Sequence, residues 1–148
     1  LRPRHARPAP PARARRAVRR AREDADWIKM IVPGGAGPGV VAGTVALWSS
    51  AGHSPGGGTG PVPETGWMVL PEFQGRGLGK QRVRMLLELA REDGRWGLVH
   101  AFPATGNTPS NGICRSLGFR HLGEVDVSFA DRVLRSNHWA VDPRTDLI

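Results

Sequence analysis

The chain has 148 residues, which is enough for one domain with a hydrophobic core and too few for two. Its formal net charge of +8 is confined to one end: residues 1–22 hold nine arginines and no acid, whereas residues 23–148 hold twelve Lys and Arg against thirteen Asp and Glu. The single cysteine excludes an intrachain disulfide and suits a reducing, cytoplasmic compartment. No apolar run approaches the ~18 residues of a membrane span, so we expect no membrane partner.

Residues 1–22 are predicted to be a tail outside the folded domain. Residues 1–22 are rich in arginine and proline, and we expect a disordered or frayed segment ahead of a domain at residues 23–148. An arm that touches nucleic acid or acidic surfaces would have this composition, and so would a solvated or mis-assigned leader, which we favour. The chain begins with Leu1 rather than Met, as a fragment or a chain with a mis-assigned start would.

Three strands are expected before the first secure helix. Residues 27–32 and 40–48 are apolar and β-branched runs on either side of a Gly- and Pro-rich stretch, which predicts a hairpin. Residues 49–63 are rich in Ser, Gly and Pro and predict a long loop. Residues 64–70 form the third predicted strand.

The following helix is the clearest element of the sequence. Val83, Leu86, Leu87 and Ala90 fall at i, i+3, i+4 and i+7, and Gly94 stands where a left-handed residue commonly closes a helix. With a fourth strand at residues 98–102, the pattern predicts a strand, helix, strand unit with parallel strands.

The start of this helix carries a glycine loop. Gly75, Gly77 and Gly79 remove side chains ahead of the first turn, whose amide N–H groups have no partner inside a helix. With the helix dipole and the charges of Arg76 and Lys80, the loop indicates a site for phosphate or pyrophosphate, although a ligand-free turn would have the same composition.

Spacing excludes two familiar phosphate loops. A P-loop would need a glycine and a Ser or Thr where the chain has Gln74 and Gln81, and the dinucleotide fingerprint would need a small residue in place of Lys80.

A short helix and two strands complete the chain. Thr108 is the expected N-cap of the helix, with Pro109 at the first helical position and Gly118 at its end. Residues 124–129 alternate between apolar and polar, as in a strand with one wet face, and residues 137–141 predict a last antiparallel strand that carries Trp139.

Two motifs resemble the signatures of the GNAT superfamily of N-acetyltransferases. Gln-x-x-Gly-x-Gly, preceded by Val-Leu-Pro at residues 69–71, resembles its acetyl-coenzyme A loop, and Asn-x-x-Ser-x-x-Ile-Cys-x-x-Leu-Gly-Phe at residues 107–119 resembles its second signature. The residues around both motifs are similar to those of the RimJ/RimL-type branch of this superfamily. The resemblance spans residues 24–146 and leaves out the front, where the family has a first strand and two helices that wall the acceptor pocket.

The resemblance implies a fold, a reaction and partners. The fold would be α/β (α+β), a mixed, largely antiparallel twisted sheet with a central parallel strand-helix-strand unit and two helices after the cofactor strand. The reaction would move an acetyl group from acetyl-CoA to a primary amine, on a protein N-terminus or a small molecule. A homodimer is compatible with it. No histidine has a partner at metal-ligand spacing, so we expect no metal.

The resemblance also assigns cofactor-binding residues, on the strand, in the loop and at the start of the short helix. They are Trp67, Met68, Val69, Leu70, Gln74, Gly75, Arg76, Gly77, Leu78, Gly79, Lys80, Asn107 and Ser110. Asn107 has an alternative role in simple turn chemistry.

The catalytic residues are less directly indicated. Glu64 is the candidate base for the amine, with an exposed strand-edge glutamate as the alternative. Many family members protonate the leaving thiolate with a tyrosine at the position of Cys114, and this chain has no tyrosine. Cys114, Ser110 or water could serve, although we favour Cys114 as a small buried helix residue. A backbone N–H near residues 67–69 would meet the oxyanion.

Two other classes of function stay open. A CoA-binding domain without catalysis would keep the loop and lack the acceptor wall. A nucleic-acid binder would act through residues 1–22 and bind in a strongly salt-dependent way. A cysteine hydrolase built on Cys114 is disfavoured, because no local signature places a His or Asp to activate it.

Overall fold

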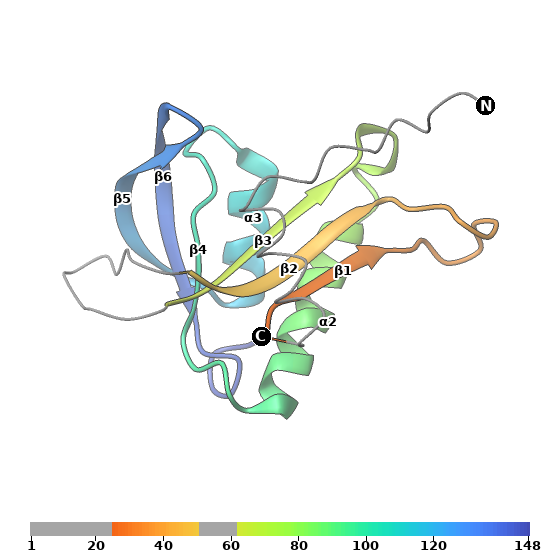
Figure 1. Ribbon diagram of the computed structural model, residues 1–148, viewed down its shortest axis with the longest axis horizontal. Helices are drawn as coiled ribbons and strands as arrows, with labels where there is room; N and C mark the ends of the chain where they lie inside the picture. The colour runs from red at the N-terminus through yellow and green to blue at the C-terminus, as the bar shows by residue number, and fades with distance from the viewer. Residues whose placement is uncertain (1–24, 51–61) are drawn as a thin grey trace, which may run out of the picture.

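The computed structural model describes residues 25–50 and 62–148. The predicted tail at residues 1–22 and most of the predicted loop at residues 49–63 lie outside the described residues. In chain order the elements of Figure 1 are β1 Trp27–Ile31, β2 Gly43–Ser50, β3 Val62–Val69, the 3-10 turn η1 Pro71–Phe73, α2 Leu78–Asp93, β4 Val99–Ala101, α3 Thr108–Leu117, β5 Arg120–Phe129 and β6 Arg132–Val141.

The described strands form one sheet in the order β1-β2-β3-β4-β6-β5. Every neighbouring pair is antiparallel except β3 and β4, which are joined through α2 and run parallel. The predicted mixed sheet with a central parallel unit is therefore confirmed. The strands β2 and β3 reach further than predicted, because Ser49 pairs with Pro63 and Ser50 with Val62 inside the stretch expected to be loop.

The helices pack through the faces that the sequence periodicity predicts. Val83, Leu86, Leu87 and Ala90 are the buried apolar side chains of α2, and Gly94 closes the helix in a left-handed conformation. The helix contacts β2, β3 and α3, and α3 contacts β5. Each fully buried leucine or valine contributes about 1.5–3 kcal/mol. No helix in the described part of the chain is long and apolar enough to cross a membrane.

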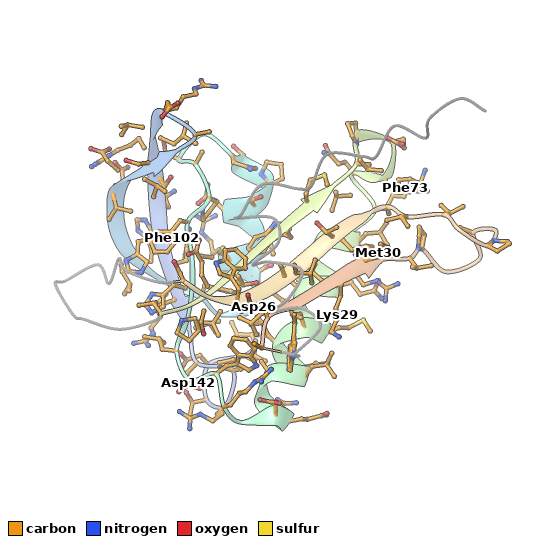
Figure 2. The ribbon with its side chains drawn as sticks, in the orientation of Figure 1. Asp26, Lys29, Met30, Phe73, Phe102 and Asp142 are labelled. Atoms are coloured by element: carbon orange, nitrogen blue, oxygen red, sulfur yellow. The ribbon has the colours of Figure 1, made fainter. Side chains whose placement is uncertain are left out.

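The other face of β1 to β3 carries exposed apolar side chains. Alternate residues of a strand point to opposite faces, so Trp27 and Ile31 are buried beneath α2 while Ile28 and Met30 point away from it. Met68 of β3 is register partner of Thr44 and lies on the same exposed face. Figure 2 labels Met30 on β1, the strand at one edge of the sheet.

The short helix α3 begins one residue earlier than a Thr108 cap would allow. Its N-cap is Asn107, whose side-chain Oδ1 accepts a hydrogen bond from the backbone N–H of Ser110 at 3.2 Å. The prediction of Thr108 as N-cap was therefore wrong, and Thr108 is the first helical residue. Asn and Thr are both good caps, and the choice between them depends on which backbone leaves the helical region; here Asn107 does, with ψ at 79°.

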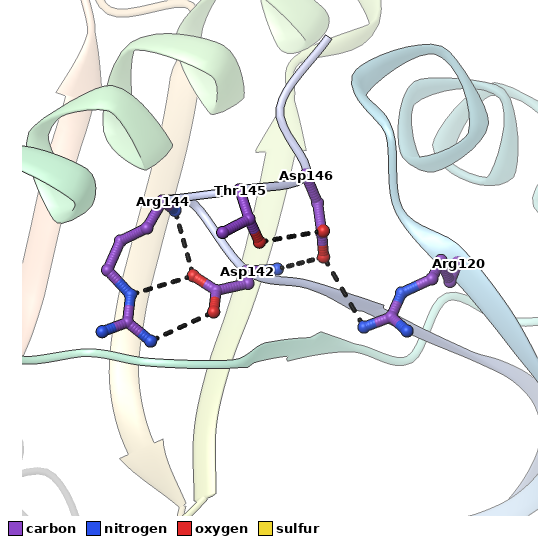
Figure 3. Close-up of polar contacts among 5 residues, drawn as sticks. All are labelled: Arg120, Asp142, Arg144, Thr145 and Asp146. Carbon is purple, nitrogen blue, oxygen red and sulfur yellow. Dashed lines mark hydrogen bonds and ion pairs between the residues drawn. The ribbon is translucent and has the colours of Figure 1, made fainter.

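The C-terminal segment folds back against the end of α3. The Asp146 carboxylate accepts a hydrogen bond from the backbone N–H of Asp142 at 2.8 Å and pairs with Arg120 at 3.6 Å. Figure 3 draws both contacts. The backbone N–H of Ile148 donates to Leu117 O at 3.3 Å. Beside it, Gly118 ends α3 at φ 96°, and a Cβ there would lie 2.2 Å from the Asp146 carbonyl oxygen. The segment therefore fits only against a glycine.

Substitutions at the two glycines that end α2 and α3 distinguish the cost of backbone strain from the cost of a steric clash. Gly94 has φ 79° and open space around it, so we expect Gly94→Ala to cost about 1 kcal/mol of unfolding free energy. Gly118→Ala adds a clash with the C-terminal segment, and we expect about 3 kcal/mol in total. Urea denaturation of both variants measures this; equal losses would mean that the C-terminal segment does not dock as described.

Candidate functional site

The site forms where two parallel strands part. The strands β3 and β4 share one pair of register partners, Glu64 and His100. Beyond Glu64, β3 has a strand neighbour only on the β2 side, where Trp67 faces Val45. Figure 1 shows β3 and β4 running in divergent directions. The backbone edge of β3 that faces the gap is thus available to another extended chain, in the manner of strand addition.

One cavity, here called the loop cavity, occupies the wide end of the gap. Its volume is about 500 Å³, and it brings together every residue predicted to bind the cofactor except Leu70 and Arg76. The end of β3, the glycine loop and the first turns of α2 and α3 all contribute to its lining. Sequence reasoning missed Phe73, Pro109 and Ile113, whose side chains complete it.

The glycine loop is shaped by backbone conformation. Gly77 is the N-cap of α2 with φ 74°, and no side chain caps the helix there. The first-turn amides of α2 therefore have no side-chain acceptor among the described residues. A Cβ at Gly79 would lie 3.1 Å from Ile113 Cδ1 and 3.4 Å from Val69 Cγ2, in the narrow space between β3 and α3.

Two loop side chains hold the loop itself. Gln74 Nε2 donates to the carbonyl oxygen of Val69 at 2.9 Å, which ties the loop to the end of β3. The Arg76 guanidinium lies 5.5 Å from the centre of the Phe73 ring and donates to Glu72 O at 3.3 Å. Gln74 lines the loop cavity while Arg76 does not, so Gln74 has both a structural bond and a place at the site.

A second cavity, here called the inter-strand cavity, lies at the narrow end of the gap and has a volume of about 200 Å³. It shares Trp67, Asn107 and Ser110 with the loop cavity, so the two spaces meet at these residues. Glu64 lines it and was predicted. Nothing in the sequence marks the other lining residues as site residues, because they are ordinary strand and loop residues until the sheet assembles: Trp48, Thr65, Gly66, Ala101, Phe102 and Pro103.

Glu64 is partly buried at the point where the strands still touch. Its register partners are Trp48 on β2 and His100 on β4. Burial raises the pKa of its carboxyl above the usual range, and a hydrogen bond from the Ser50 side chain acts in the opposite direction. A carboxylate with a raised pKa is a better proton acceptor than an exposed one.

Trp67 lines both cavities and also carries a buried polar group. Its indole Nε1–H is buried and has no hydrogen-bond partner among the described residues. A buried donor without a partner costs about 1–3 kcal/mol, so such groups commonly mark a place that a ligand or water completes.

The start of α3 is fixed by one buried amide. Asn111 is 7% exposed, and its Nδ2 donates to Ala104 O at 2.9 Å and to Asn107 O at 2.8 Å. Its Oδ1 accepts from Asn137 Nδ2 and from Trp139 Nε1, both at 2.9 Å. This network ties α3 to β6 and so sets the position of Asn107, whose own side chain caps the helix. Sequence reasoning did not single out Asn111, which lies at an unremarked position between the motif residues.

The two candidate proton donors lie in different surroundings. Ser110 lines both cavities. Cys114 is one turn further along α3, fully buried in the hydrophobic core, and it lines neither cavity. Burial raises the pKa of its thiol to about 12. Within the described residues, no group of three or more His, Cys, Asp or Glu side chains could hold a metal ion.

Comparison with known proteins gives the family. The model of the acetyltransferase (GNAT) domain matches residues 2–120, and the chain belongs to this family. The match begins upstream of residue 24, where the resemblance of the motifs was expected to begin. No curated protein matches the chain in sequence.

Several solved structures share the fold. The ribosomal-protein-S5-alanine acetyltransferase of Vibrio fischeri superposes with a TM-score of 0.71 at 16% identity, over 90% of this chain and 70% of that one. RimL, a ribosomal L7/L12 α-N-protein acetyltransferase solved with coenzyme A, gives 0.69 at 14% identity over 90% and 71%. The yncA protein of Salmonella typhimurium, solved with its cofactor acetyl-CoA, gives 0.66 at 22% identity over 88% and 73%.

The burial of Cys114 makes a direct prediction about its reactivity. The thiolate is the reactive form, and a buried thiol with a pKa of about 12 is almost entirely protonated at pH 8. We expect an aromatic disulfide reagent to modify native Cys114 at least about a hundredfold more slowly than free cysteine, and to modify it fully in urea. Because the chain has one cysteine, the reaction reports this residue alone. Fast modification of the folded protein would show that Cys114 is accessible to the site.

Proposed function

We propose that the chain is an acetyl-CoA-dependent N-acetyltransferase that acts on a primary amine in the cytoplasm. The observation that carries the proposal is the meeting of the loop cavity and the inter-strand cavity at Trp67, Asn107 and Ser110. A thioester held in one cavity and an amine held in the other would react at this junction. Family membership supplies the reaction class.

The residues of the loop cavity fit acetyl-CoA. Side-chain-free glycines at 75, 77 and 79 let a pyrophosphate approach the first-turn amides of α2, and Lys80 adds positive charge at the same place. The unpaired edge of β3 suits the amide groups of a pantetheine arm. The yncA and RimL structures hold acetyl-CoA and CoA in the same fold.

Amide formation requires a base for the amine, a donor to the developing oxyanion and a proton for the leaving thiolate, and this chain has a candidate group for each. Glu64 takes a proton from the amine, which frees its lone pair to attack the thioester carbon. A backbone N–H near residues 67–69 stabilises the negative oxygen that forms there. As the C–S bond breaks, the thiolate takes a proton from Ser110 or from water, and the second proton lost by the amine nitrogen restores that donor. Ser110 is the better placed of the two side chains considered because Cys114 lies in the core.

The alternative of a CoA-binding domain without catalysis is tested by the same assay. We expect the 148-residue chain to release CoA thiol from acetyl-CoA only when an amine is added. The amine panel includes peptides with free N-termini, because two neighbours in fold are named as acetyltransferases of ribosomal proteins. Isothermal titration with CoA measures binding separately. Binding without amine-dependent release would favour the binding domain, and no binding would overturn both readings.

Glu64 provides the sharpest prediction for the reaction. We expect Glu64→Gln to lower kcat by about a hundredfold or more, the range for loss of a general base, with little change in KM for acetyl-CoA. In the unaltered protein, activity should fall as pH drops through the raised pKa of Glu64, because the protonated carboxyl no longer accepts a proton. This acid limb should be absent in Glu64→Gln.

The matched control is Glu92→Gln, an exposed carboxyl near the far end of α2. It should leave kcat and the pH profile unchanged. Folding is not expected to confound the result: burial favours the protonated Glu64 carboxyl, so a neutral amide at this position should not lower stability at neutral pH. A Glu64→Gln variant with kcat within about threefold of the parent would remove Glu64 as the base.

A further inference from the structure

The inter-strand cavity has an unusual lining for its size. Trp48 and Phe102 contribute aromatic side chains to its lining, and Glu64 is the only ionisable residue that lines it among the residues the structure describes. Within residues 25–50 and 62–148, no Lys, Arg or His contributes to the lining. A space of about 200 Å³ with aromatic walls and one carboxylate is suited to a small cation.

The position of Trp48 depends on a glycine. Trp48 on β2 and Glu64 on β3 are register partners, so their side chains lie on the same face of the sheet. Gly66 is the next residue of β3 on that face, and a Cβ there would lie 3.1 Å from Trp48 Cη2. The absence of a side chain at Gly66 therefore lets the indole ring lie over β3 beside the carboxylate.

Phe102 is supported from behind by two histidines. Its ring stacks on His138 with centroids 4.7 Å apart and planes inclined by 17° (Figure 2 labels Phe102), so its other ring face is the one available to the cavity. His138 is 5% exposed, and its Nε2 lies 2.8 Å from His100 Nδ1 in a hydrogen bond. Burial lowers the pKa of both imidazoles, so the pair is neutral at physiological pH and adds no competing positive charge.

We propose that the inter-strand cavity binds the acceptor as a primary ammonium, held against the rings of Trp48 and Phe102 and facing the Glu64 carboxylate. The inference rests on the proposed function and adds how the acceptor is selected: the two aromatic rings favour an ammonium, from an alkylamine or a protein N-terminus, over a neutral group of similar size such as an alcohol. Trp48 and Phe102 determine specificity, and Glu64 both attracts the cation and receives its proton, which leaves the neutral amine beside the loop cavity.

Binding without acetyl-CoA tests the cage separately from the reaction. The probes are propylammonium chloride and its neutral counterpart 1-propanol, each titrated into the full chain and followed by saturation-transfer NMR. We expect propylammonium to bind at least about tenfold more tightly, because only the cation gains from the aromatic faces and the carboxylate. Equal affinity for the two probes would overturn the proposal.

Substitutions at Trp48 separate a cage from a simple ion pair. We expect Trp48→Leu to weaken propylammonium binding about fivefold or more, and Trp48→Phe to retain most of it, since phenylalanine keeps an aromatic face. Circular dichroism confirms that each variant is folded. If Glu64→Gln abolishes binding while Trp48→Leu binds as the parent does, the site is an ion pair without a cage and the proposal fails.

The source of the ammonium is resolved by competition. Displacement of propylammonium by a peptide with a free N-terminus, and not by the same peptide after N-acetylation, would assign the cavity to protein N-termini. Displacement by the acetylated peptide would contradict ammonium recognition. Cation binding without acetyl transfer would support the ammonium site and contradict the proposed acetyltransferase activity. Acetyl transfer to amines, with equal binding of propylammonium and propanol, would support the activity and contradict the ammonium site.

Discussion

The parting of two parallel strands is the constraint on which the site depends. A sheet whose central strands stayed paired would satisfy its backbone internally and leave no room for a ligand. Here β3 and β4 meet at Glu64 and His100 and then separate, which leaves the edge of β3 without a strand neighbour on that side. Both cavities follow from this divergence, one at each end of the gap. The glycine loop occupies its wide end because it continues directly from β3.

Polar contacts around α3 maintain the gap. The Asn111 side chain makes four hydrogen bonds. They join the start of α3, at Asn107, to Ala104 in the segment after β4 and to Asn137 and Trp139 on β6. A buried amide with fully satisfied partners fixes one arrangement, because any shift leaves a donor or acceptor unpaired. Ser110, one residue before Asn111, is thereby held where the two cavities meet. Cys114, on the buried side of the same helix, is part of the packing that supports this arrangement.

Local signals were predicted well because their causes are local. The apolar face of α2, its glycine end and the loop before it depend on residues within a few positions of one another, and the structure places them as the periodicity indicated. The cap of α3 was missed by one residue, since Asn107 and Thr108 are both competent caps and only the backbone path chooses between them. The strand ends at Ser50 and Val62 were missed because pairing between strands overrides weak propensity.

The sequence by itself indicated the family, the glycine loop and Glu64 as a candidate base, because each of the two motifs and the amphipathic helix lies within one short run of residues. Only the tertiary structure decided what surrounds that base. Trp48 and Phe102 are 54 positions apart and become neighbours of Glu64 only when β2, β3 and β4 are aligned in register. The burial of Glu64 that raises its pKa, and the burial of Cys114 that removes it from the site, likewise arise from packing between distant segments.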